Sequence, residues 1–287
     1  MTYTPGYVVV GHLSKDLPVG GGETGGGTVL YAGVTAAQLG VPTALVTACA
    51  AADRGLLAPA EAAGVLCAVQ PSPATTTFSM EYYGEARQLY LHARATPLGP
   101  AALPAAWQGT PILHLGPVAD EVDAAAAWDT VCPHALIGVT PQGWMRAWDA
   151  AGRITATPWT GAAPLLARTD VLVMSLEDTA GDQEALLGYV ALVPLAVVTA
   201  AGAGATLYEW GRPVALVPAC PATPVDFTGA GDVFAAAFLI RYHETGDALR
   251  AIAFAHAAAA YAIEAPGSAG IAARAAVVAR SAAGRGD

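Results

Sequence analysis

Short, almost entirely apolar segments recur along the chain, and stretches with helical spacing lie between most of them. They read YVVVGHL (7–13), TALVTA (43–48), GVLCAV (64–69), PILHLG (111–116), HALIGV (134–139), DVLVMS (170–175) and LAVVTA (195–200). Strands of this kind are buried on both faces, which is typical of parallel sheets covered by helices. The pattern therefore predicts a three-layer α/β/α fold around a mainly parallel sheet.

Glycines delimit the helical segments. TVLYAGVTAAQLG (28–40) and DRGLLAPAEAAG (53–64) both end in glycine, the residue preferred just after a helix. VFAAAFLIRYHETG (233–246) and DALRAIAFAHAAAAYAIEAPG (247–267) predict two longer helices after a hairpin at ATLYEWGRPVALVP (205–218). Because no repeat or linker interrupts this series, we expect a single domain over residues 1–287.

One region departs from the alternation of strands and helices. TTTFSMEYYGEARQLYLHARA (75–95) alternates polar and apolar residues around YGEAR, which predicts an antiparallel hairpin. Such a hairpin either lies at the edge of a sheet or forms a flap over a binding site. The residues alone leave both interpretations open.

The chain carries few basic groups. Its formal net charge is −10, and Lys15 is its single lysine. Affinity for nucleic acid or for an anionic membrane is therefore not expected as a bulk effect. A phosphate site in this chain would have to depend on backbone amides, arginine or metal.

The cysteines and the apolar runs bear on the compartment. Four scattered cysteines without a CxxC pair suit a reducing environment. The amino terminus lacks the pattern of an export signal, and the longest apolar run, AIAFAHAAAAYAI (251–263), is shorter than the roughly 20 residues that span a bilayer. These observations predict a soluble, cytoplasmic protein.

PVDFTGAGDVFAAAF (224–238) is the most informative segment for chemistry. If a helix begins near Gly229, the amides of Gly229, Ala230 and Gly231 point outward at the positive end of its dipole, which makes an anion site. Asp232 would repel an anion, so it is expected to act on a neutral neighbour, taking a proton from an attacking hydroxyl. The alternative is that Asp232 only caps a glycine-rich turn.

A second glycine-rich segment, GGGETGGGTVLYAG (20–33), formally contains GxGxxG at Gly20, Gly22 and Gly25. These glycines do not directly follow the first strand, and no acid lies about 20 residues further on, so a dinucleotide site is poorly supported. We favour a loop that brings backbone close to a polar ligand beside Asp16, interpreted as the end of the first strand segment. An exposed turn acid is the alternative for Asp16.

Two acids follow the apolar run DVLVM in SLED (175–178). Glu177 and Asp178 could hold Mg²⁺ through water, or they could cap a helix. His256 lies among alanines in a predicted helix, where it is expected to be packed rather than catalytic.

Together these segments resemble the ribokinase-like (PfkB-type) carbohydrate kinase family. Its D-x-T-G-A-G-D-x-F signature is matched from Asp226 to Phe234, and VVTAAGAGATLYEWG (197–211) resembles the preceding strand and turn. VVVGHLSKD (8–16) and GGGTVLYAGVTAAQLG (25–40) resemble the first strand, the substrate acid and the Gly-Gly helix. The resemblance runs from Tyr7 to about Ala272, and it implies a ribokinase-like fold with a small β lid at about 12–24 and 75–95.

The resemblance implies transfer of the γ-phosphoryl group of ATP to a hydroxyl of a small polyol, assisted by Mg²⁺. It makes Asp232 the general base, and it gives the amides of Gly229, Ala230 and Gly231 the task of stabilising the transferring phosphoryl group. The implied substrate positions are Asp16, Gly26, Gly27, Tyr31 and Gln142. The implied nucleotide positions are Thr199, Gly202, Gly204, Thr228 and His256. Asp226 and Thr228 leave room for a monovalent cation such as K⁺.

Departures from the family pattern bear on the substrate. Tyr31 or a neighbour stands where many members have asparagine, SLED replaces N-x-x-E, and Ala201 replaces a glycine. GGTVLYA together with QGWMR (142–146) is most similar to a subgroup that includes myo-inositol kinases, so a cyclitol acceptor is favoured over a sugar. The alternatives are a nucleoside or other polyol kinase, a ligand-binding homologue without catalysis, and a dinucleotide-dependent oxidoreductase. The polar-edged hairpin could also pair with a second subunit in a homodimer.

Overall fold

A nine-stranded sheet forms the centre of the computed structural model, which describes residues 4–83 and 86–283. Its strand order is β15-β14-β13-β12-β9-β8-β1-β4-β5. The strands are β1 (Tyr7–Val10), β4 (Thr43–Cys49), β5 (Leu66–Pro71), β8 (Ile112–Leu115), β9 (Leu136–Val139), β12 (Val171–Ser175), β13 (Leu195–Thr199), β14 (Ala205–Glu209) and β15 (Arg212–Val217). All strand pairs from β5 to β13 are parallel, and only the pairs β13–β14 and β14–β15 are antiparallel. The predicted mainly parallel sheet is confirmed.

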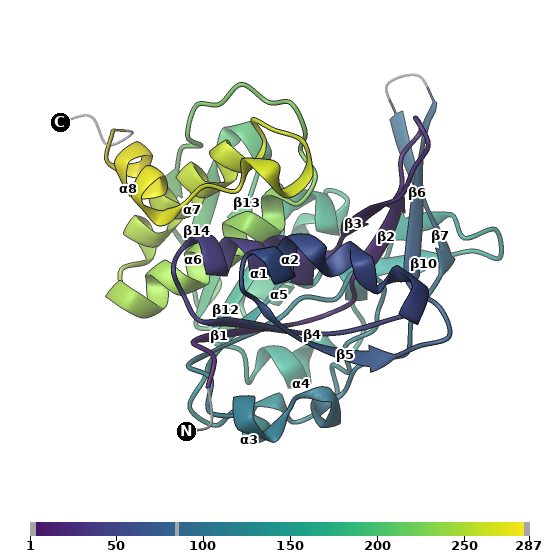
Figure 1. Cartoon of the computed structure of the whole chain (residues 1–287). Coiled ribbons are helices and arrows are strands. Elements are labelled where there is room, and N and C mark those ends of the chain that lie inside the picture. Colours follow the sequence, from purple (N-terminus) through teal and green to yellow (C-terminus); the bar gives the residue numbers. More distant parts are fainter. Residues whose placement is uncertain (1–3, 84–85, 284–287) are drawn as a thin grey trace.

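Helices cover both faces of this sheet, as the buried strands require. Figure 1 shows α1 (Thr28–Gln38), α2 (Ala58–Ala62), α6 (Ala230–Thr245) and α7 (Ala248–Ala262) on one side, and α3 (Trp128–Val131) and α4 (Ala162–Leu166) on the other. Strand β1 illustrates why two cores form: Tyr7 and Val9 enter one, while Val8 and Val10 enter the other. Helix α5 (Gln183–Val190) joins the second core, and α8 (Arg274–Ala283) packs on α7. The three-layer α/β/α architecture is therefore confirmed.

A second, four-stranded sheet lies at one end of the molecule (Figure 1). Its order is β3-β2-β6-β7, with β2 (Ser14–Leu17), β3 (Thr24–Gly26), β6 (Thr76–Tyr83) and β7 (Ala86–Ala93). The hairpin predicted at 75–95 is thus present, although its turn at Gly84 and Glu85 lies outside the described residues. That this sheet works as a lid stays a prediction.

The position of Asp16 differs from the expectation. The first strand ends at Val10, and Asp16 lies inside β2, which pairs in parallel with β6 in the second sheet. The buried apolar run stops after Val10, and the chain then crosses closely over the loop after β8: a Cβ on Gly11 would lie 2.3 Å from the carbonyl oxygen of Gly116. The chain therefore leaves the main sheet before it reaches Asp16.

A short two-stranded sheet extends the second sheet. Strands β10 (Arg146–Trp148) and β11 (Ile154–Ala156) pair with each other, and an isolated bridge joins Tyr90 of β7 to Arg153. The amide of Leu91 also donates to the carbonyl of Gly152 over 2.7 Å. The sequence patterns did not indicate this hairpin. Its consequence is that Arg146 stands between the main sheet and the second sheet.

His12 fastens the second sheet to the first. Its ring nitrogens lie 2.6 Å from the hydroxyl of Thr76 and 2.9 Å from the carbonyl of Thr96, while its amide donates to the Glu121 carboxylate over 2.8 Å. Burial lowers the pKa of His12, although Glu121 acts in the opposite sense. The base of the second sheet is therefore held by buried hydrogen bonds.

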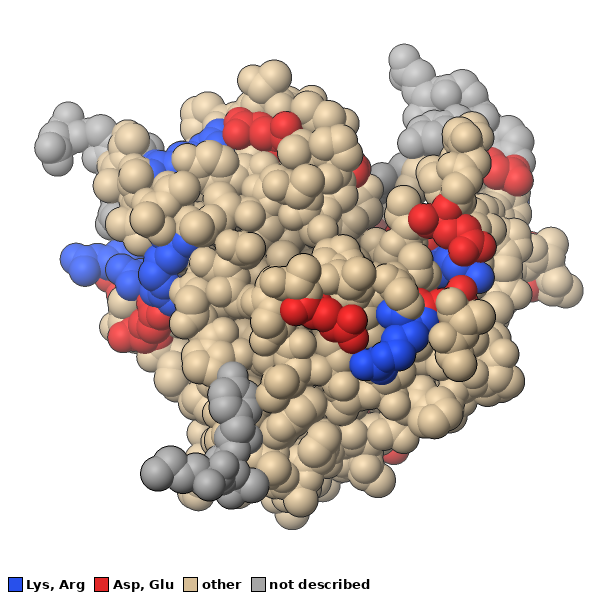
Figure 2. All heavy atoms as spheres, viewed as in Figure 1, with Lys and Arg blue, Asp and Glu red and all other residues tan. Residues whose placement is uncertain are grey.

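Charged side chains are sparse on the surface. On the face in Figure 2, most of the surface is uncharged and the basic groups lie beside acidic ones. In the part of the chain that the structure describes, no helix combines the length and the hydropathy needed to cross a bilayer.

Candidate active site

Acidic and basic side chains from distant parts of the chain converge where the parallel strands of the main sheet end. This edge is where open α/β sheets bind ligands. The groups come from β2, the start of α1, the loops after β9 and β12, and the first turn of α6. They are Asp16, Thr28, Gln142, Arg146, Asp178 and Asp232.

Asp232 lies in the first turn of α6, partly buried. Burial raises the pKa of this carboxyl to about 6, against the lowering effect of a hydrogen bond from Thr28 and the charge of Arg146. The neighbouring acids Asp178 and Asp16 raise it further. A carboxyl of this kind is ionised at neutral pH and still basic enough to accept a proton from a hydroxyl.

The turn that precedes Asp232 has the conformation expected of an anion site. Gly229 caps α6 with φ 75°, and α6 begins at Ala230. The amide of Ala230 was expected to be unpaired, but it donates to the carbonyl of Phe227 over 3.3 Å. Among the residues that the structure describes, the amides of Gly231 and Asp232 meet no protein acceptor. Of the three amides expected to face an anion, only that of Ala230 is therefore paired within the described part of the chain.

The ring of Tyr31 packs against the backbone of this turn at Gly229. A Cβ added to Gly229 would lie 2.3 Å from the ring of Tyr31, so the glycine backbone rests directly on the aromatic face. Burial raises the pKa of Tyr31, and the charges of Asp16, Asp226 and Asp232 raise it further. Its expected contact with a substrate stays a prediction, whereas its packing against Gly229 is a role that the sequence patterns did not indicate.

Gly229→Ala is expected to destabilise the fold by about 2–4 kcal/mol, because the methyl group meets Tyr31 and the left-handed backbone disfavours a side chain. Gly231→Ala is the matched control two residues further on. A Cβ on Gly231 would have nothing within 4 Å, and alanine is the better helix former by up to about 1 kcal/mol. Chemical denaturation of both variants checks the pair, and an equal loss of stability in the two would contradict the packing of Gly229 on Tyr31.

Asp16 is held against the Gly26–Gly27 segment. Its Oδ1 accepts a hydrogen bond from the hydroxyl of Ser14 over 2.9 Å, and burial raises the pKa of its carboxyl. A Cβ on Gly26 would lie 2.2 Å from Oδ2 of Asp16, and one on Gly27 would lie 2.4 Å from the carbonyl of His12. The glycines are thus needed because the Asp16 carboxylate and the His12 carbonyl lie against their backbone. That this loop also approaches a polar ligand stays a prediction.

The GxGxxG match does not form a dinucleotide site. Gly20 and Gly22 lie exposed in the turn between β2 and β3. A dinucleotide fingerprint requires the first glycine to end a strand of the parallel sheet and the last to open a helix. The dinucleotide alternative is therefore not supported by the fold.

Arg146 is the residue that the sequence analysis quoted but gave no role. It opens β10, and its Nη1 donates to the carbonyl of Val118 over 2.8 Å. Its guanidinium carbon lies 5.7 Å from the centre of the Phe78 ring. Burial lowers its pKa, while Asp178, Asp232, Glu121 and Asp16 act in the opposite sense. The available signal was an arginine in QGWMR of a chain with one lysine.

Asp178 belongs to the same cluster, and Glu177 does not. Ser175 and Asp178 form a capping box, in which Oδ2 of Asp178 accepts the amide of Ser175 over 2.8 Å. Burial raises the pKa of Asp178, and hydrogen bonds from Ser175 and the Gln142 side chain oppose this. Glu177 is exposed on the same turn. Over residues 4–83 and 86–283, no group of three or more His, Cys, Asp or Glu side chains could hold a metal ion.

Most of the residues expected at a nucleotide lie near the ends of β13 and β15, whereas Thr228 precedes α6. The hydroxyl of Thr199 donates to the carbonyl of Met174 over 3.3 Å, and Gly202 is exposed in the turn that follows β13. A Cβ on Gly204 would lie 2.2 Å from the carbonyl of Val217, so only glycine fits there. Ala201, which replaces a glycine of the family pattern, has the left-handed φ of 46°. The turn therefore keeps its shape despite the substitution.

Asp226 and Thr228 lie just ahead of the turn at residues 229–232, the proposed anion-binding turn. Oδ1 of Asp226 accepts the amide of Thr228, and Oδ2 accepts the amide of Gly267, both over 2.9 Å. Burial by itself would raise the pKa of Asp226, but these hydrogen bonds keep it below the ordinary value. The segment before α6 is thus tied to the chain after α7.

His256 is 8% exposed on α7. Its ring meets that of Phe234 edge-on at 5.0 Å, and burial lowers its pKa. Its Nε2 has no hydrogen-bond partner among the described residues. Packing against α6 is therefore shown, and a nucleotide contact stays a prediction.

The comparisons with known proteins agree with this arrangement. Residues 171–274 match the model of the pfkB family carbohydrate kinases. A ribokinase of Bacillus subtilis (strain 168) is 38% identical over 73 residues, which is 25% of this chain and 25% of that protein. The alignment therefore spans about a quarter of the length of this curated relative.

Solved structures match over almost the entire chain. A pyrophosphate-dependent kinase in the ribokinase family, complexed with a pyrophosphate analog and myo-inositol, has a TM-score of 0.79 at 22% identity, with 95% of this chain and 99% of that chain covered. Arabidopsis thaliana ribokinase, complexed with ribose and ATP, has a TM-score of 0.73 at 20% identity, with 97% and 99% covered. The whole chain therefore has the ribokinase-like fold. The pfkB family model matches residues 171–274, and the ribokinase-like fold extends over almost the whole chain.

Proposed function

We propose that the protein is a carbohydrate kinase that moves the γ-phosphoryl group of ATP to a hydroxyl of a small polyol, with Asp232 as general base. The observation that carries this proposal is the first turn of α6. There, a carboxyl whose pKa is raised to about 6 stands beside the amides of Gly231 and Asp232. Among the described residues, neither amide donates a hydrogen bond to a protein acceptor. An anion and a neutral hydroxyl can both be served at such a turn.

The chemical step follows from these groups. The acceptor hydroxyl loses its proton to the carboxylate of Asp232 while its oxygen bonds to the γ-phosphorus, and the bond from that phosphorus to the bridging oxygen breaks to release ADP. The amide of Gly231 and the guanidinium of Arg146 offset the negative charge on the transferring group. Thr28 orients the carboxylate through its hydroxyl.

The acceptor is expected to lie between Asp16 and Asp232. Asp16 would accept hydrogen bonds from vicinal hydroxyls. Gly26 and Gly27 are the expected substrate positions beside it, and the absence of their side chains leaves room for the Asp16 carboxylate and the His12 carbonyl. Gln142 offers an amide beside Asp178, and Tyr31, which packs against Gly229, is a further expected substrate contact. A cyclitol of the myo-inositol type is the favoured acceptor, supported by the similarity to a kinase complexed with myo-inositol.

The donor side is formed by Thr199, Gly202, Gly204, Thr228 and His256. Most of these positions lie near the ends of β13 and β15, which suits ATP, and the Arabidopsis ribokinase of the same fold is complexed with ATP. Pyrophosphate is the second candidate, because a similar structure is that of a pyrophosphate-dependent kinase. The two donors differ in that ATP carries a nucleoside and pyrophosphate does not, so only ATP would need the nucleotide positions around β13 and β15.

Two cations belong to the proposal. The donor atoms of Asp178 and Gln142 are oxygens, which suits Mg²⁺ held partly through water, with Glu177 on the same turn as a weaker candidate. Mg²⁺ supplies positive charge to the donor phosphates when it is bound. Asp226 and Thr228 would hold a monovalent cation such as K⁺, although both carboxylate oxygens of Asp226 already accept backbone amides.

The compartment and the assembly are also part of the proposal. Cys49, Cys67, Cys132 and Cys220 are all free, which fits the expected cytoplasm. A homodimer through the second sheet is the expected assembly.

A panel of acceptors with two donors tests the function. ATP or pyrophosphate is supplied with Mg²⁺ and one of myo-inositol, ribose or a nucleoside, and the release of ADP or phosphate is measured. We expect turnover with ATP and a cyclitol. Turnover with a sugar or nucleoside would change only the acceptor. Acceptor binding without turnover by either donor would instead identify a binding homologue that has lost catalysis.

A further inference from the structure

The connection between β15 and α6 is long, and it ends at the anion-binding turn. It runs over residues 218–229 without helix or strand. Two of its apolar side chains point away from the core, because Val225 is 63% and Phe227 is 64% exposed. Apolar packing therefore contributes little to its conformation. Whatever orders this segment also orders the amides that would receive the donor phosphate.

Hydrogen bonds to the end of α7 and to α8 hold the segment instead. The amide of Thr223 donates to Oε1 of Glu264 over 3.2 Å. The amides of Val225 and Asp226 both donate to the carbonyl of Ile263, over 2.6 and 3.1 Å. One turn of chain after α7 thus accepts three amides of the segment.

Arg280 of α8 closes this arrangement. Its two terminal nitrogens donate to the two carboxylate oxygens of Glu264, both over 2.8 Å, and Nη2 also donates to the carbonyl of Pro221 over 2.5 Å. The guanidinium lies 4.4 Å from the centre of the Tyr261 ring. Only 18% of the Arg280 side chain and 31% of the Glu264 side chain are exposed. Bidentate pairing with aromatic stacking is the geometry that arginine provides and lysine does not.

We propose that Arg280 is a positioning residue for the phosphoryl donor. It fixes the carboxylate of Glu264 and the carbonyl of Pro221, and these fix the segment that carries the amides of the anion-binding turn. The hydrogen bond from Arg280 holds the pKa of Glu264 below its ordinary value, in keeping with a permanently ionised pair. The kinetic part of this inference rests on the proposed kinase function, whereas the ordering of residues 218–229 does not.

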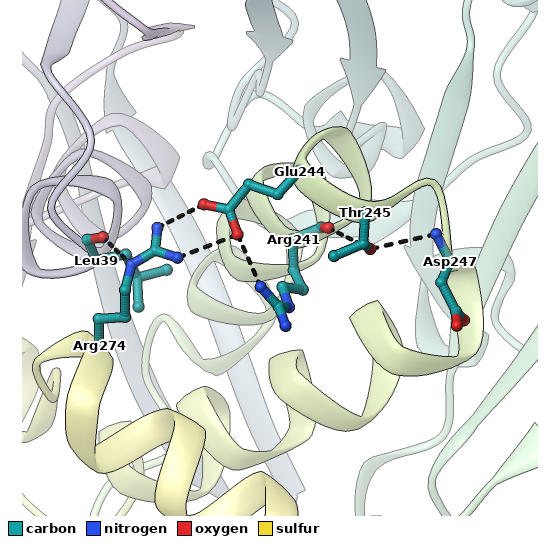
Figure 3. A network of polar contacts seen from close by, with 6 residues as sticks. All are labelled: Leu39, Arg241, Glu244, Thr245, Asp247 and Arg274. Carbon is teal, nitrogen blue, oxygen red and sulfur yellow. Dashed lines mark hydrogen bonds and ion pairs between the residues drawn. The ribbon is translucent and has the colours of Figure 1, made fainter.

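Arg274 is a matched control on the same helix. It donates to both carboxylate oxygens of Glu244, over 2.7 and 3.1 Å, and also to the carbonyl of Leu39 at the end of α1 (Figure 3). Arg241 shares the same carboxylate. The bonds of Arg274 are thus equal in number and kind to those of Arg280, but they join the ends of α1 and α6 that lie away from the anion-binding turn.

Hydrogen exchange of the intact protein tests the ordering without any substrate. In Arg280→Ala and Glu264→Gln, the amides of Thr223, Val225 and Asp226 are expected to exchange at least tenfold faster than in the wild type, because their acceptors are no longer fixed. In Arg274→Ala these amides should keep their wild-type rates. Unchanged exchange in Arg280→Ala, or equal acceleration in both arginine variants, would overturn the proposal.

Steady-state kinetics test the consequence for the donor. Arg280→Ala is expected to lower kcat/KM for the donor by about 10- to 100-fold, as misplacement of binding groups by about 1 Å does, with the acceptor KM unchanged. Arg280→Lys should recover little, because it lacks the planar fork. Arg274→Ala should lower Tm by about as much as Arg280→Ala does, but it should leave the KM for the donor unchanged. A parallel rise of both KM values would show a general structural effect and overturn the positioning role. If the wild type transfers no phosphoryl group, the proposed function fails and the exchange experiment still decides the ordering.

Discussion

Asp232→Asn is expected to lower phosphoryl transfer by about 10²–10⁴-fold, the range that a general base contributes. Asparagine keeps the size of the side chain and can still accept the hydrogen bond from Thr28, but it cannot take the proton of the acceptor. In the wild type, kcat/KM should rise with pH through about 6, because the base must be ionised to act. The variant should lose this acid limb together with its activity.

The same substitution is expected to stabilise the fold at neutral pH. The pKa of Asp232 is about 6 in the folded state against an ordinary 3.8, so the folded protein prefers the protonated form. The contribution of Asp232 to the free energy of unfolding is therefore largest below pH 3.8, and it decreases as the pH rises to about 6. A pKa difference of one corresponds to about 1.4 kcal/mol, and partial exposure reduces the total to about 1–3 kcal/mol above pH 6. The neutral amide of the variant would carry no such cost.

Two measurements separate these effects. Turnover is measured with the donor and acceptor found in the substrate panel, and the free energy of unfolding is measured at about pH 5 and about pH 8, on either side of the raised pKa. Asp129→Asn is the control, because Asp129 lies on the surface and pairs with Arg168. An Asp232→Asn variant that keeps turnover within tenfold of the wild type would exclude Asp232 as the base. If Asp232→Asn is less stable than the wild type at the higher pH, the ionised carboxylate of Asp232 in the wild type stabilises the folded state instead of destabilising it.

The parts of the site that could be predicted are those that lie close together in the sequence. Gly229, Ala230, Gly231 and Asp232 form one turn, so their spacing alone indicated the helix start and the carboxyl in its first turn, while the anion site stays a prediction. The strands of the main sheet were recognised for a similar reason, because burial on both faces leaves an apolar run that is local in the sequence.

The parts that could not be predicted depend on contacts between distant residues. The raised pKa of Asp232 comes from burial and from Asp178 and Asp16, which only the fold brings near. Nothing in the local pattern shows that Tyr31, near the amino terminus, packs beneath Gly229. Asp16 was interpreted as the end of the first strand segment, although that strand ends at Val10 and Asp16 lies in β2. The pairing of β2 with β6 joins residues far apart in the sequence, which the local pattern does not show.

Arg146 is the residue whose removal should have the second large effect on activity. It stands among the carboxyl groups of Asp16, Asp178 and Asp232, with its guanidinium anchored to the carbonyl of Val118. The neighbourhood of Asp232 therefore has an arginine in a chain whose single lysine is Lys15. Loss of one preorganised donor to a developing charge typically costs about 10²–10³-fold in rate.

Arg146→Ala is therefore expected to lower kcat by about 10²–10³-fold and to move the acid limb of the pH profile. Arg146 lowers the pKa of Asp232, so its removal should shift that limb from about pH 6 to a higher pH. Arg146→Lys should keep the limb closer to its wild-type position, since the charge remains, but recover less of the rate, since the fork is lost.

Arg153→Ala is the matched control for Arg146→Ala. Arg153 lies at the far end of the same hairpin, where its Nε donates to Gln88 of β7 over 2.9 Å. Its loss should loosen the attachment of the hairpin to the second sheet without changing the charge near Asp232. If both variants lose activity equally and keep the wild-type acid limb, Arg146 acts only by holding the hairpin in place. If only Arg146→Ala shifts the acid limb of the pH profile, the positive charge of Arg146 lowers the pKa of Asp232. That charge then offsets the negative charges of the three carboxylates around it.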